Sequence, residues 1–486
     1  MSESAADLLN KLSIDSKKVS EEPKESIPVK EQTESKVADS EGSQTKDSNE
    51  KVEEEESKEE SKEDKKSDGL ITSSHQVLVK LADLQADPNS PLYSVKSFEE
   101  LGLPQEILKG LYAMKFSKPS KIQEKALPLL LSNPPQNMIG QSQSGTGKTA
   151  AFALTMISRV DESNPAVQCI CISPARELAR QTMDVVTEMA KFTKVKTQLL
   201  VPGELERGDS INGQIIVGTP GIILDLARRK RLSTAHVKVF VLDEADNMLD
   251  QQGLADQSVR IKKLLPKSTQ LVLFSATFAD DVRKYAEKYV PNANSLELKH
   301  EELNVDAITQ LYMDCNDESD KFKNLCELYG LLTIASSIIF VQTRTTANDL
   351  YYKMQKEGHV CSILHGELEN QERDRLIDDF REGRSKVLIT TNVLARGIDI
   401  PTVTMVVNYD MPFDRAGKPD PATYLHRIGR TGRFGRRGVA MSFIHNKKSY
   451  DCLQTISKFF GGMPLQQVSS DDWDEVEEIV KKAIKN

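Results

Sequence analysis

The segment SQSGTGKT at residues 142–149 carries the residue types of a phosphate-binding loop. The general pattern is G-x-x-x-x-G-K-[ST], in which glycines let backbone N–H groups turn toward phosphate oxygens and a lysine neutralises their charge. Gly147, Lys148 and Thr149 fit it, although Ser142 stands where the pattern has glycine. We predict that Lys148 contacts the β- and γ-phosphates and that the Thr149 hydroxyl holds Mg²⁺. The predicted loop contacts are Ser142, Gln143, Ser144, Gly145, Thr146, Gly147, Lys148 and Thr149.

A carboxylate cluster, Asp243-Glu244-Ala245-Asp246, directly follows the apolar run 237–242. On its own such a cluster is more often the start of a helix, where acidic side chains cap free N–H groups. Downstream of a phosphate loop, it indicates that Asp243 holds Mg²⁺ and that Glu244 polarises an attacking water.

A third motif, HRIGRTGR at residues 426–433, places Arg427, Arg430 and Arg433 three residues apart. On a helix this spacing would align the three side chains on one face. The face is either a solvated basic surface or a set of arginine fingers that reach a γ-phosphate across a cleft. The spacing alone leaves both interpretations open.

The elements that must position these motifs are short, nearly continuous apolar runs that alternate with helical patterns. Such runs predict parallel sheets covered by helices on both faces, so the fold class is α/β. Polar motifs follow most of the runs, at the strand ends where open α/β sheets bind ligands. The runs are 137–142, 168–173, 214–219, 237–244 and 269–277 in a first series, and 336–343, 385–391, 403–410 and 439–444 in a second.

Charge divides the chain further. Residues 1–70 hold 21 acidic and 12 basic side chains and no aromatic residue, which accounts for the whole net charge of −9. Such a composition cannot bury enough apolar surface to fold, so we expect a disordered acidic tail. We predict this tail at 1–70, an N-terminal extension at 71–95, one α/β domain at 96–298, a linker at 299–306 and a second α/β domain at 307–486.

Composition also excludes several classes. No run of about 18 apolar residues is present, which argues against a membrane span, and the first residues lack a secretory pattern. The six cysteines form no C-x2-C pair, so a zinc site is not expected, and Cys169 and Cys171 are typical of a buried strand. This cysteine usage fits a reducing cytosolic or nuclear compartment.

Taken together, the motifs resemble those of the DEAD-box RNA helicases, whose signature tetrapeptide stands at 243–246. Nearly the full motif set follows in family order over roughly residues 96–445. The resemblance implies two tandem RecA-like domains, ATP and Mg²⁺ as cofactors, and ATP-dependent RNA binding with local duplex unwinding by a monomer.

Further site residues follow from this resemblance alone. Phe98, Phe116 and Gln123 resemble the family's adenine-binding motif, and Lys115 stands where the family usually has glycine, which we expect to matter little. The residues that resemble those coupling hydrolysis to domain closure are Asp246, Ser275, Thr277 and Arg396, while Asp399 resembles a ribose contact and His426, Arg430 and Arg433 the catalytic residues of the second domain.

The same resemblance implies RNA contacts in both domains, made to phosphate and sugar and hence with little sequence specificity. They are Arg176, Thr219, Gly221, Thr343, Gly366, Arg373 and Thr390. Asn370 and the stretch Val201-Pro202-Gly203 depart from the usual family pattern.

Finer likeness, in segments 79–103, 240–254 and 420–438, is to a fungal subgroup that acts in mRNA export. It implies location in nucleus and cytoplasm, at the cytoplasmic face of the nuclear pore. It also implies a pore nucleoporin and an inositol-phosphate-dependent export activator as partners. The alternative function is an ATP-gated RNA clamp with little unwinding, while a DNA helicase or a small-molecule kinase fits the motifs less well.

Overall fold

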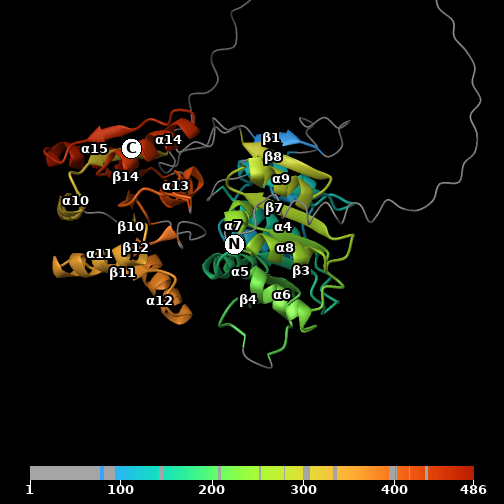
Figure 1. Cartoon of the computed structure of the whole chain (residues 1–486). Coiled ribbons are helices and arrows are strands. Elements are labelled where there is room, and N and C mark those ends of the chain that lie inside the picture. Colours follow the sequence, from blue (N-terminus) through green and yellow to red (C-terminus); the bar gives the residue numbers. More distant parts are fainter. Residues whose placement is uncertain are drawn as a thin grey trace, which may run out of the picture.

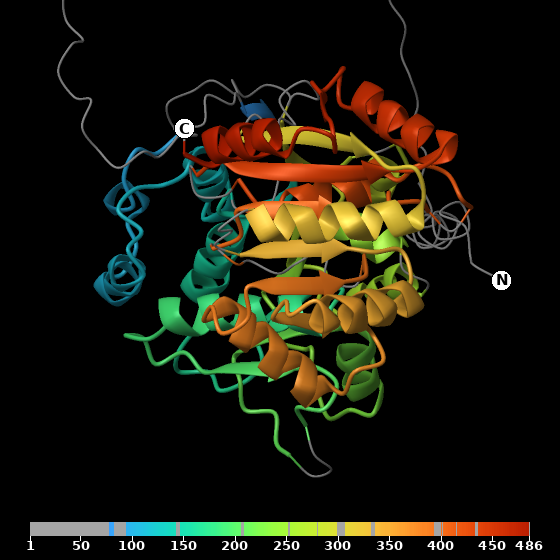
Figure 2. The same cartoon turned by 90° about the vertical axis from the view of Figure 1, so that its left-hand side faces the viewer.

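The computed structural model describes residues 77–81, 94–141, 146–205, 209–250, 253–278, 280–298, 307–331, 336–392, 400, 402–414, 416–432 and 436–485. Within these residues the chain forms two β-sheets, each with helices on both faces, as Figures 1 and 2 show. The predicted acidic tail (1–70), most of the predicted extension (71–95) and the predicted linker (299–306) lie outside the described residues.

The first sheet and its helices, called the first domain below, carry the phosphate loop and the DEAD cluster. Its strands in spatial order are β1 (Val77–Lys80), β8 (Ala293–Leu298), β2 (Asn137–Gln141), β7 (Gln270–Ser275), β6 (Val239–Leu242), β3 (Cys169–Ile172), β5 (Ile215–Gly218) and β4 (Thr197–Leu200). All neighbouring pairs are parallel except β1 with β8. The helical elements are η2 (Glu99–Leu101), α2 (Gln105–Ala113), α3 (Lys121–Leu130), α4 (Lys148–Arg159), α5 (Arg176–Met189), α6 (Pro220–Arg228), α7 (Ala245–Asp250), α8 (Leu254–Lys262) and α9 (Asp280–Tyr289).

The second sheet, with its helices the second domain, is parallel throughout its described strands. In spatial order these are β11 (Cys361–Leu364), β12 (Val387–Thr390), β10 (Ser337–Phe340), β13 (Met405–Asn408), β14 (Gly438–Ile444), β9 (Ile308–Asp314) and β15 (Gln466–Val468). The helices are α10 (Glu318–Leu331), α11 (Arg344–Lys356), α12 (Asn370–Arg381), α13 (Pro421–Ile428), α14 (Lys447–Phe459) and α15 (Trp473–Lys485).

Strand β3 shows why apolar runs become central strands here. Successive side chains of a strand point to opposite faces. Cys169 and Cys171 enter one core cluster and Ile170 and Ile172 the other, and all four are fully buried. Burial raises the pKa of the Cys169 thiol to about 12. The α/β fold class and the burial of these two cysteines are therefore confirmed.

The two domains meet through helices that follow strand ends. Figure 1 shows α12 and α13 of the second domain on the side that faces the first domain, toward α5 and α7. Hydrogen bonds join α12 to α5 and α13 to α7 directly. Among the described residues, the structure contains no helix of the length and apolar character needed to cross a bilayer.

Candidate active site

Helix α4 starts at Lys148, so the last two residues of the predicted phosphate loop form its first turn. Gly147 adopts φ +99°, and a Cβ there would collide with the Gln123 amide, so the position requires glycine. The Ser120 hydroxyl donates to the Thr146 carbonyl over 2.7 Å, and the Gln123 Nε2 donates to the Gly147 carbonyl over 2.9 Å. The start of α3 thus holds the loop end at a helix N-terminus, where anions are favoured. Residues 142–145 of the predicted loop lie outside the described residues.

The predicted adenine-binding residues differ in burial. Phe116 is half-buried against the first core cluster, whereas Phe98 lies fully buried within that cluster. Gln123 is 1% exposed, and its Oε1 accepts from the Ser120 backbone N–H over 3.0 Å. An amide has two donor and two acceptor positions, so Gln123 retains one of each after these contacts. The ring of Phe98 packs in the core, so of the two predicted aromatic residues only Phe116 lies near the surface.

Lys148 lies beside the DEAD carboxylates at the carboxyl end of β6. Lys148, Asp243 and Glu244 are each at most 7% exposed. The Lys148 Nζ and the Glu244 Oε2 are buried, and neither has a hydrogen-bond partner among the described residues. Burial raises the pKa of Asp243, Lys148 opposes the rise, and Glu244 adds to it. Buried polar groups are normally paired, so these two atoms indicate a site built for a further polar ligand.

Glu244 itself has φ +50°, a left-handed conformation that costs a non-glycine residue free energy. Strain of this kind persists where the surrounding structure enforces it and clusters at functional sites. The Glu244 N–H donates to the Asp243 Oδ1 over 3.0 Å, which fixes the turn between β6 and α7. The turn places the Asp243 carboxylate where it interacts with Lys148 at the start of α4.

A chain of hydrogen bonds leads from the DEAD cluster to the other domain. The Thr277 hydroxyl donates to the Asp246 Oδ2 over 2.9 Å, and the Asp246 N–H donates to the Ser275 Oγ over 3.2 Å. On the far side, the His426 Nε2 lies 3.1 Å from the same Asp246 Oδ2. His426 and Asp246 are 1% and 2% exposed, so this bridge between domains is buried. The structure therefore brings together four predicted residues that lie up to 180 positions apart.

The arginines of the HRIGRTGR motif do not share a helix face. Helix α13 ends at Ile428, before Arg430, and Arg427 is fully buried. The Arg427 guanidinium donates to the Asn392 Oδ1 over 2.6 Å, and burial lowers its pKa to about 10. The prediction of one aligned face is wrong because the helix stops after two turns, and Arg427 supports the core. Arg430 is 2% exposed; Arg433, Arg396 and Asp399 lie outside the described residues.

The predicted RNA contacts of the first domain lie at the N-termini of α5 and α6. Thr219 is the N-cap of α6, and Gly221 is exposed in its first turn. Arg176 begins α5, but its guanidinium contacts the Pro202 carbonyl and forms ion pairs with Glu204 and Asp374. Arg373, predicted as a second-domain RNA contact, pairs with Glu177 across the domains at 2.5 Å. Both arginines thus serve the domain interface in this structure.

Across from them, a cavity of about 410 Å³ opens at the strand ends of the second domain. Its lining contains the predicted contacts Thr343 and Gly366, together with Gln342, Arg344, Thr391 and Asn392. Thr390 is fully buried, and its hydroxyl donates to the Leu364 carbonyl over 2.9 Å. Thr391, the residue directly after β12, lines the cavity, so the proposed contact moves to Thr391.

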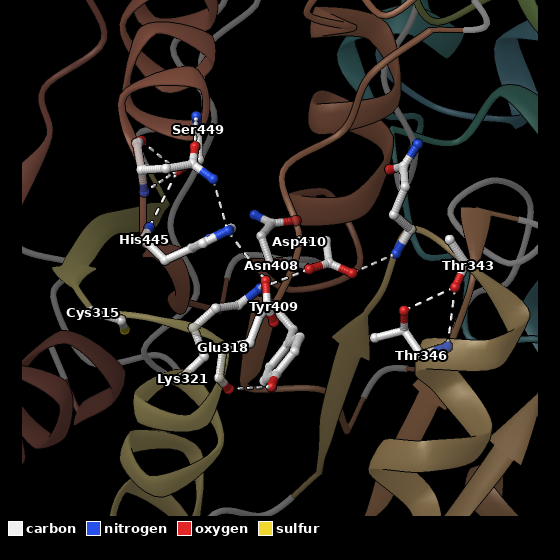
Figure 3. A network of polar contacts seen from close by, with 12 residues as sticks. Cys315, Glu318, Lys321, Thr343, Thr346, Asn408, Tyr409, Asp410, His445 and Ser449 are labelled. Carbon is white, nitrogen blue, oxygen red and sulfur yellow. Dashed lines mark hydrogen bonds and ion pairs between the residues drawn. The ribbon is translucent and has the colours of Figure 1, made fainter.

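A polar network behind this cavity was not predicted (Figure 3). Lys321 is fully buried and pairs with the Asp410 Oδ1 at 2.7 Å, while the Asp410 Oδ2 accepts from the Gln342 N–H over 2.8 Å. The next residue, Thr343, caps α11 by accepting from the Thr346 N–H over 3.0 Å. The network thereby fixes the loop that lines the cavity. The polar residues that end the run 403–410 were the available sequence signal, but a lone lysine 89 positions away gave no hint of its partner.

Comparison with known proteins identifies the family. The sequence model described as DEAD/DEAH box helicase matches residues 120–285, and that of the helicase conserved C-terminal domain matches residues 320–435. The ATP-dependent RNA helicase DBP5 of Debaryomyces hansenii is 66% identical over 489 residues, which cover 99% of this chain and 98% of that protein. The chain belongs to the DEAD-box family of ATP-dependent RNA helicases.

Solved structures of DEAD-box helicases add the arrangement of the domains. Saccharomyces cerevisiae Dbp5 bound to RNA and ADP BeF3 is 68% identical and matches with a TM-score of 0.79, covering 80% of this chain and 100% of that one. A point variant of the same helicase, bound to nup159, gle1, ip6 and adp, is 66% identical, covers 79% and 100%, and reaches 0.60. The two solved structures hardly differ in sequence identity or coverage. The higher TM-score of the first therefore indicates that the two domains of this chain are arranged more as in the complex with RNA and ADP BeF3.

Proposed function

We propose that this DEAD-box helicase hydrolyses ATP efficiently only when RNA holds its two domains together. The observation that carries the proposal is the buried bridge from Thr277 through Asp246 to His426. It connects the DEAD cluster to the segment that bears Arg430, and it exists only when the domains meet. ATP and RNA that both favour this closed state necessarily increase each other's affinity.

In the nucleotide site, Lys148 binds the β- and γ-phosphates, and Glu244 orients the attacking water. The buried, unpartnered Lys148 Nζ and Glu244 Oε2 fit these roles. Thr149 and Asp243 would hold Mg²⁺, which supplies charge neutralisation at the phosphates when bound. The described residues contain no group of three or more His, Cys, Asp or Glu placed to hold a metal. When Mg²⁺ binds substrate phosphates and water, it takes only one or two protein ligands.

The remaining nucleotide contacts are proposed from the motifs. Phe116 stacks on the adenine and Gln123 bonds to its edge, while Asp399 contacts the ribose. Arg430 and Arg433 stabilise the γ-phosphate charge from the second domain, and Arg396 couples that site to the RNA face. Positively charged side chains aimed at developing charge are the main source of rate in phosphoryl transfer.

RNA would lie across the cavity of the second domain and the helix ends of the first. Thr219, Gly221, Thr343, Gly366 and Thr391 offer hydroxyls and backbone N–H groups. These groups recognise phosphate and the 2′-hydroxyl rather than base edges. We therefore propose unwinding of short duplexes, or remodelling of RNA–protein complexes, without sequence preference.

In the cell, we propose a role in mRNA export at the cytoplasmic face of the nuclear pore. A 66% identical relative is solved with nup159, gle1, ip6 and adp, which supports a nucleoporin and an inositol-phosphate-dependent activator as partners of this chain. Replacement of the gene by a Glu244→Gln form should retain polyadenylated RNA in the nucleus. An unchanged distribution of polyadenylated RNA would refute the export role while leaving the enzymology intact.

The first biochemical test is steady-state ATP hydrolysis with and without single-stranded RNA, comparing wild type with Glu244→Gln. We expect RNA to stimulate the wild type strongly and the variant to lose at least about 100-fold of that activity. Nucleotide binding by the variant is the control, because its fold and Lys148 are unchanged. Hydrolysis that is indifferent to RNA would contradict the proposal and favour the clamp.

A further inference from the structure

Helices α5 and α12 face each other across the domain interface with matched charges at three successive turns. On α5 these are Arg176, Arg180 and Asp184, and on α12 they are Asp374, Asp378 and Arg381. We call these six residues the charge ladder. The signs read plus, plus, minus on one helix and minus, minus, plus on the other. Spacings of three and four residues keep each set on one helix face.

We call each facing set of one α5 residue and one α12 residue a rung: Arg176 with Asp374, Arg180 with Asp378, and Asp184 with Arg381. Contacts between the two helices link the residues of these rungs in order. The Arg176 Nη2 lies 2.6 Å from the Asp374 Oδ2. Arg180 reaches both carboxylates, at 3.1 Å from the Asp374 Oδ1 and 3.3 Å from the Asp378 Oδ2. At the third rung Arg381 donates to the Gln181 Oε1 over 3.4 Å, and burial raises the pKa of Asp184 while Arg381 opposes that rise. The helices therefore run side by side in a single register.

Two neighbours fix the end of α12 that approaches the first domain. The Asn370 Nδ2 donates to the Pro202 carbonyl over 3.3 Å, and Gly203, at φ +82°, lies against the same amide. Asn370 and this loop are both departures from the usual family pattern, and they contact each other. The Arg373–Glu177 pair lies beside the first rung. Contacts thus surround the first rung, whereas the second rung is 34–38% exposed.

We infer that Arg180 and Asp378 are positioning residues for RNA-dependent hydrolysis, acting through Arg176 and the register of the closed domains. Arg180 contacts the carboxylate that holds Arg176, so its removal loosens the start of α5 beside the proposed RNA path. Burial alone would lower the pKa of Arg180, but the carboxylates of Asp374 and Asp378 outweigh this effect, so the pKa is raised. This is expected of a cation with acidic partners on the facing helix. Each partner belongs to the other domain, so the pairs stabilise only the closed state.

This inference rests on the proposed function, because closure by RNA is its readout. The test uses the full chain with Arg180→Asp, Asp378→Arg and the double exchange. Each single reversal places like charges opposite one another and should raise the RNA concentration for half-maximal ATPase by about 5- to 30-fold, with kcat within about twofold. The double exchange should recover part of the loss, because an acid and a base would again face each other at positions 180 and 378, while the acid at 180 would still face Asp374.

The matched control is Lys191→Asp, which reverses one charge next to the C-terminus of α5 in a pair confined to the first domain. It should leave the half-saturating RNA concentration unchanged. Failure of the double exchange to rescue, or a loss confined to kcat, would overturn the inference. So would single reversals that behave like the control.

A fluorescence-transfer pair, with one dye in each domain, separates this test from that of the proposed function. Wild type that closes with RNA and ADP-BeF3 but shows no RNA-stimulated hydrolysis would refute the proposed function alone. If the ladder positions the domains, closure of the single variants should still require about 5- to 30-fold more RNA. Closure at the wild-type RNA concentration would refute the ladder.

Discussion

The two contacts that join the domains differ in how deeply they are buried. His426 and Asp246 are almost completely excluded from solvent, at 1% and 2% exposure, whereas Arg180 and Asp378 of the charge ladder are 34% and 38% exposed. The buried bridge touches the DEAD cluster, whereas the exposed pair Arg180–Asp378 includes no residue of the proposed ligand contacts. We therefore expect the bridge to affect chemistry and the exposed pair to affect how easily the domains meet.

Solvent explains why the two contacts should respond differently to mutation. Loss of one partner by a buried charged group costs more than about 1–3 kcal/mol, because no water replaces that partner. An exposed pair contributes about 0–1 kcal/mol, because water replaces a lost partner. The bridge should therefore act in a nearly all-or-none manner, whereas the ladder should adjust RNA affinity by degrees.

The largest effect is expected from His426→Ala, which breaks the bridge from the second domain. The change removes one partner of the buried Asp246 carboxylate, which keeps its contact with Thr277. Loss of a partner by a buried charged group costs more than about 1–3 kcal/mol, so RNA-stimulated ATP hydrolysis should fall by at least about 100-fold. Steady-state hydrolysis at saturating RNA measures this loss. The control is His445→Ala, a partly exposed histidine of the same domain, which should retain wild-type activity. A His426→Ala enzyme within about threefold of wild type would remove the distinction between bridge and ladder.

A smaller effect is expected from Thr277→Val, which removes a donor to Asp246 from within the first domain. A hydrogen bond to a charged group contributes about 1.5–3 kcal/mol, so stimulated hydrolysis should fall by about 10- to 100-fold. Thr277→Ser keeps the hydroxyl and should restore most of it. Rates measured together with RNA half-saturation would show a loss in kcat, in contrast to the ladder variants. Equal activity of the valine and serine forms would show that Asp246 does not need this donor.

A strand was predictable from the sequence when it lies at the centre of its sheet. The predicted runs correspond to β2, β7, β6, β3 and β5 in one sheet and to β12, β10, β13 and β14 in the other, each a contiguous central block. The missed strands are β1, β8 and β4 in the first sheet and β11, β9 and β15 in the second, at or next to the edges. A central strand is buried on both faces and must be apolar, whereas an edge strand such as β15, QQV, keeps polar side chains.

The site follows the same logic of burial. Asp243 and Glu244 were predicted from their residue types, and Asp246 and His426 from the family resemblance, but the sequence did not reveal that Arg427 is buried. Thr390 ends β12 and is fully buried, whereas the next residue, Thr391, lines the cavity, and two neighbouring hydroxyls give no sequence signal that separates them. The ladder was missed because Asp374 and Asp378 read as an ordinary solvated helix face, and their partners lie about 200 residues away.

The smallest effect is expected from Lys115→Gly, at a position away from both the bridge and the ladder. Helix α2 ends at Ala113 with Met114 as its C-cap, and the next residue, Lys115, has φ +65°. The Lys115 N–H donates to the Tyr112 carbonyl, and the Phe116 N–H donates to the Leu111 carbonyl. This is a Schellman ending, in which glycine is preferred at the left-handed residue. The expectation that Lys115 matters little concerned the adenine contact and stays a prediction; at the helix end, the Lys115 Cβ makes this left-handed conformation strained.

Relief of the left-handed strain, about 1–2 kcal/mol, exceeds the extra chain entropy of glycine, about 0.5–1 kcal/mol. Lys115→Gly should therefore raise the free energy of unfolding by up to about 1 kcal/mol, as measured by urea denaturation of the full chain. Lys115→Ala removes the charge but keeps the Cβ, so it should give no gain. The Schellman hydrogen bonds hold Phe116 in place, so kcat and RNA half-saturation should stay at wild-type values. A glycine variant that is more stable yet unchanged in closure would show that bridge and ladder act on the closed state rather than through the stability of the first domain.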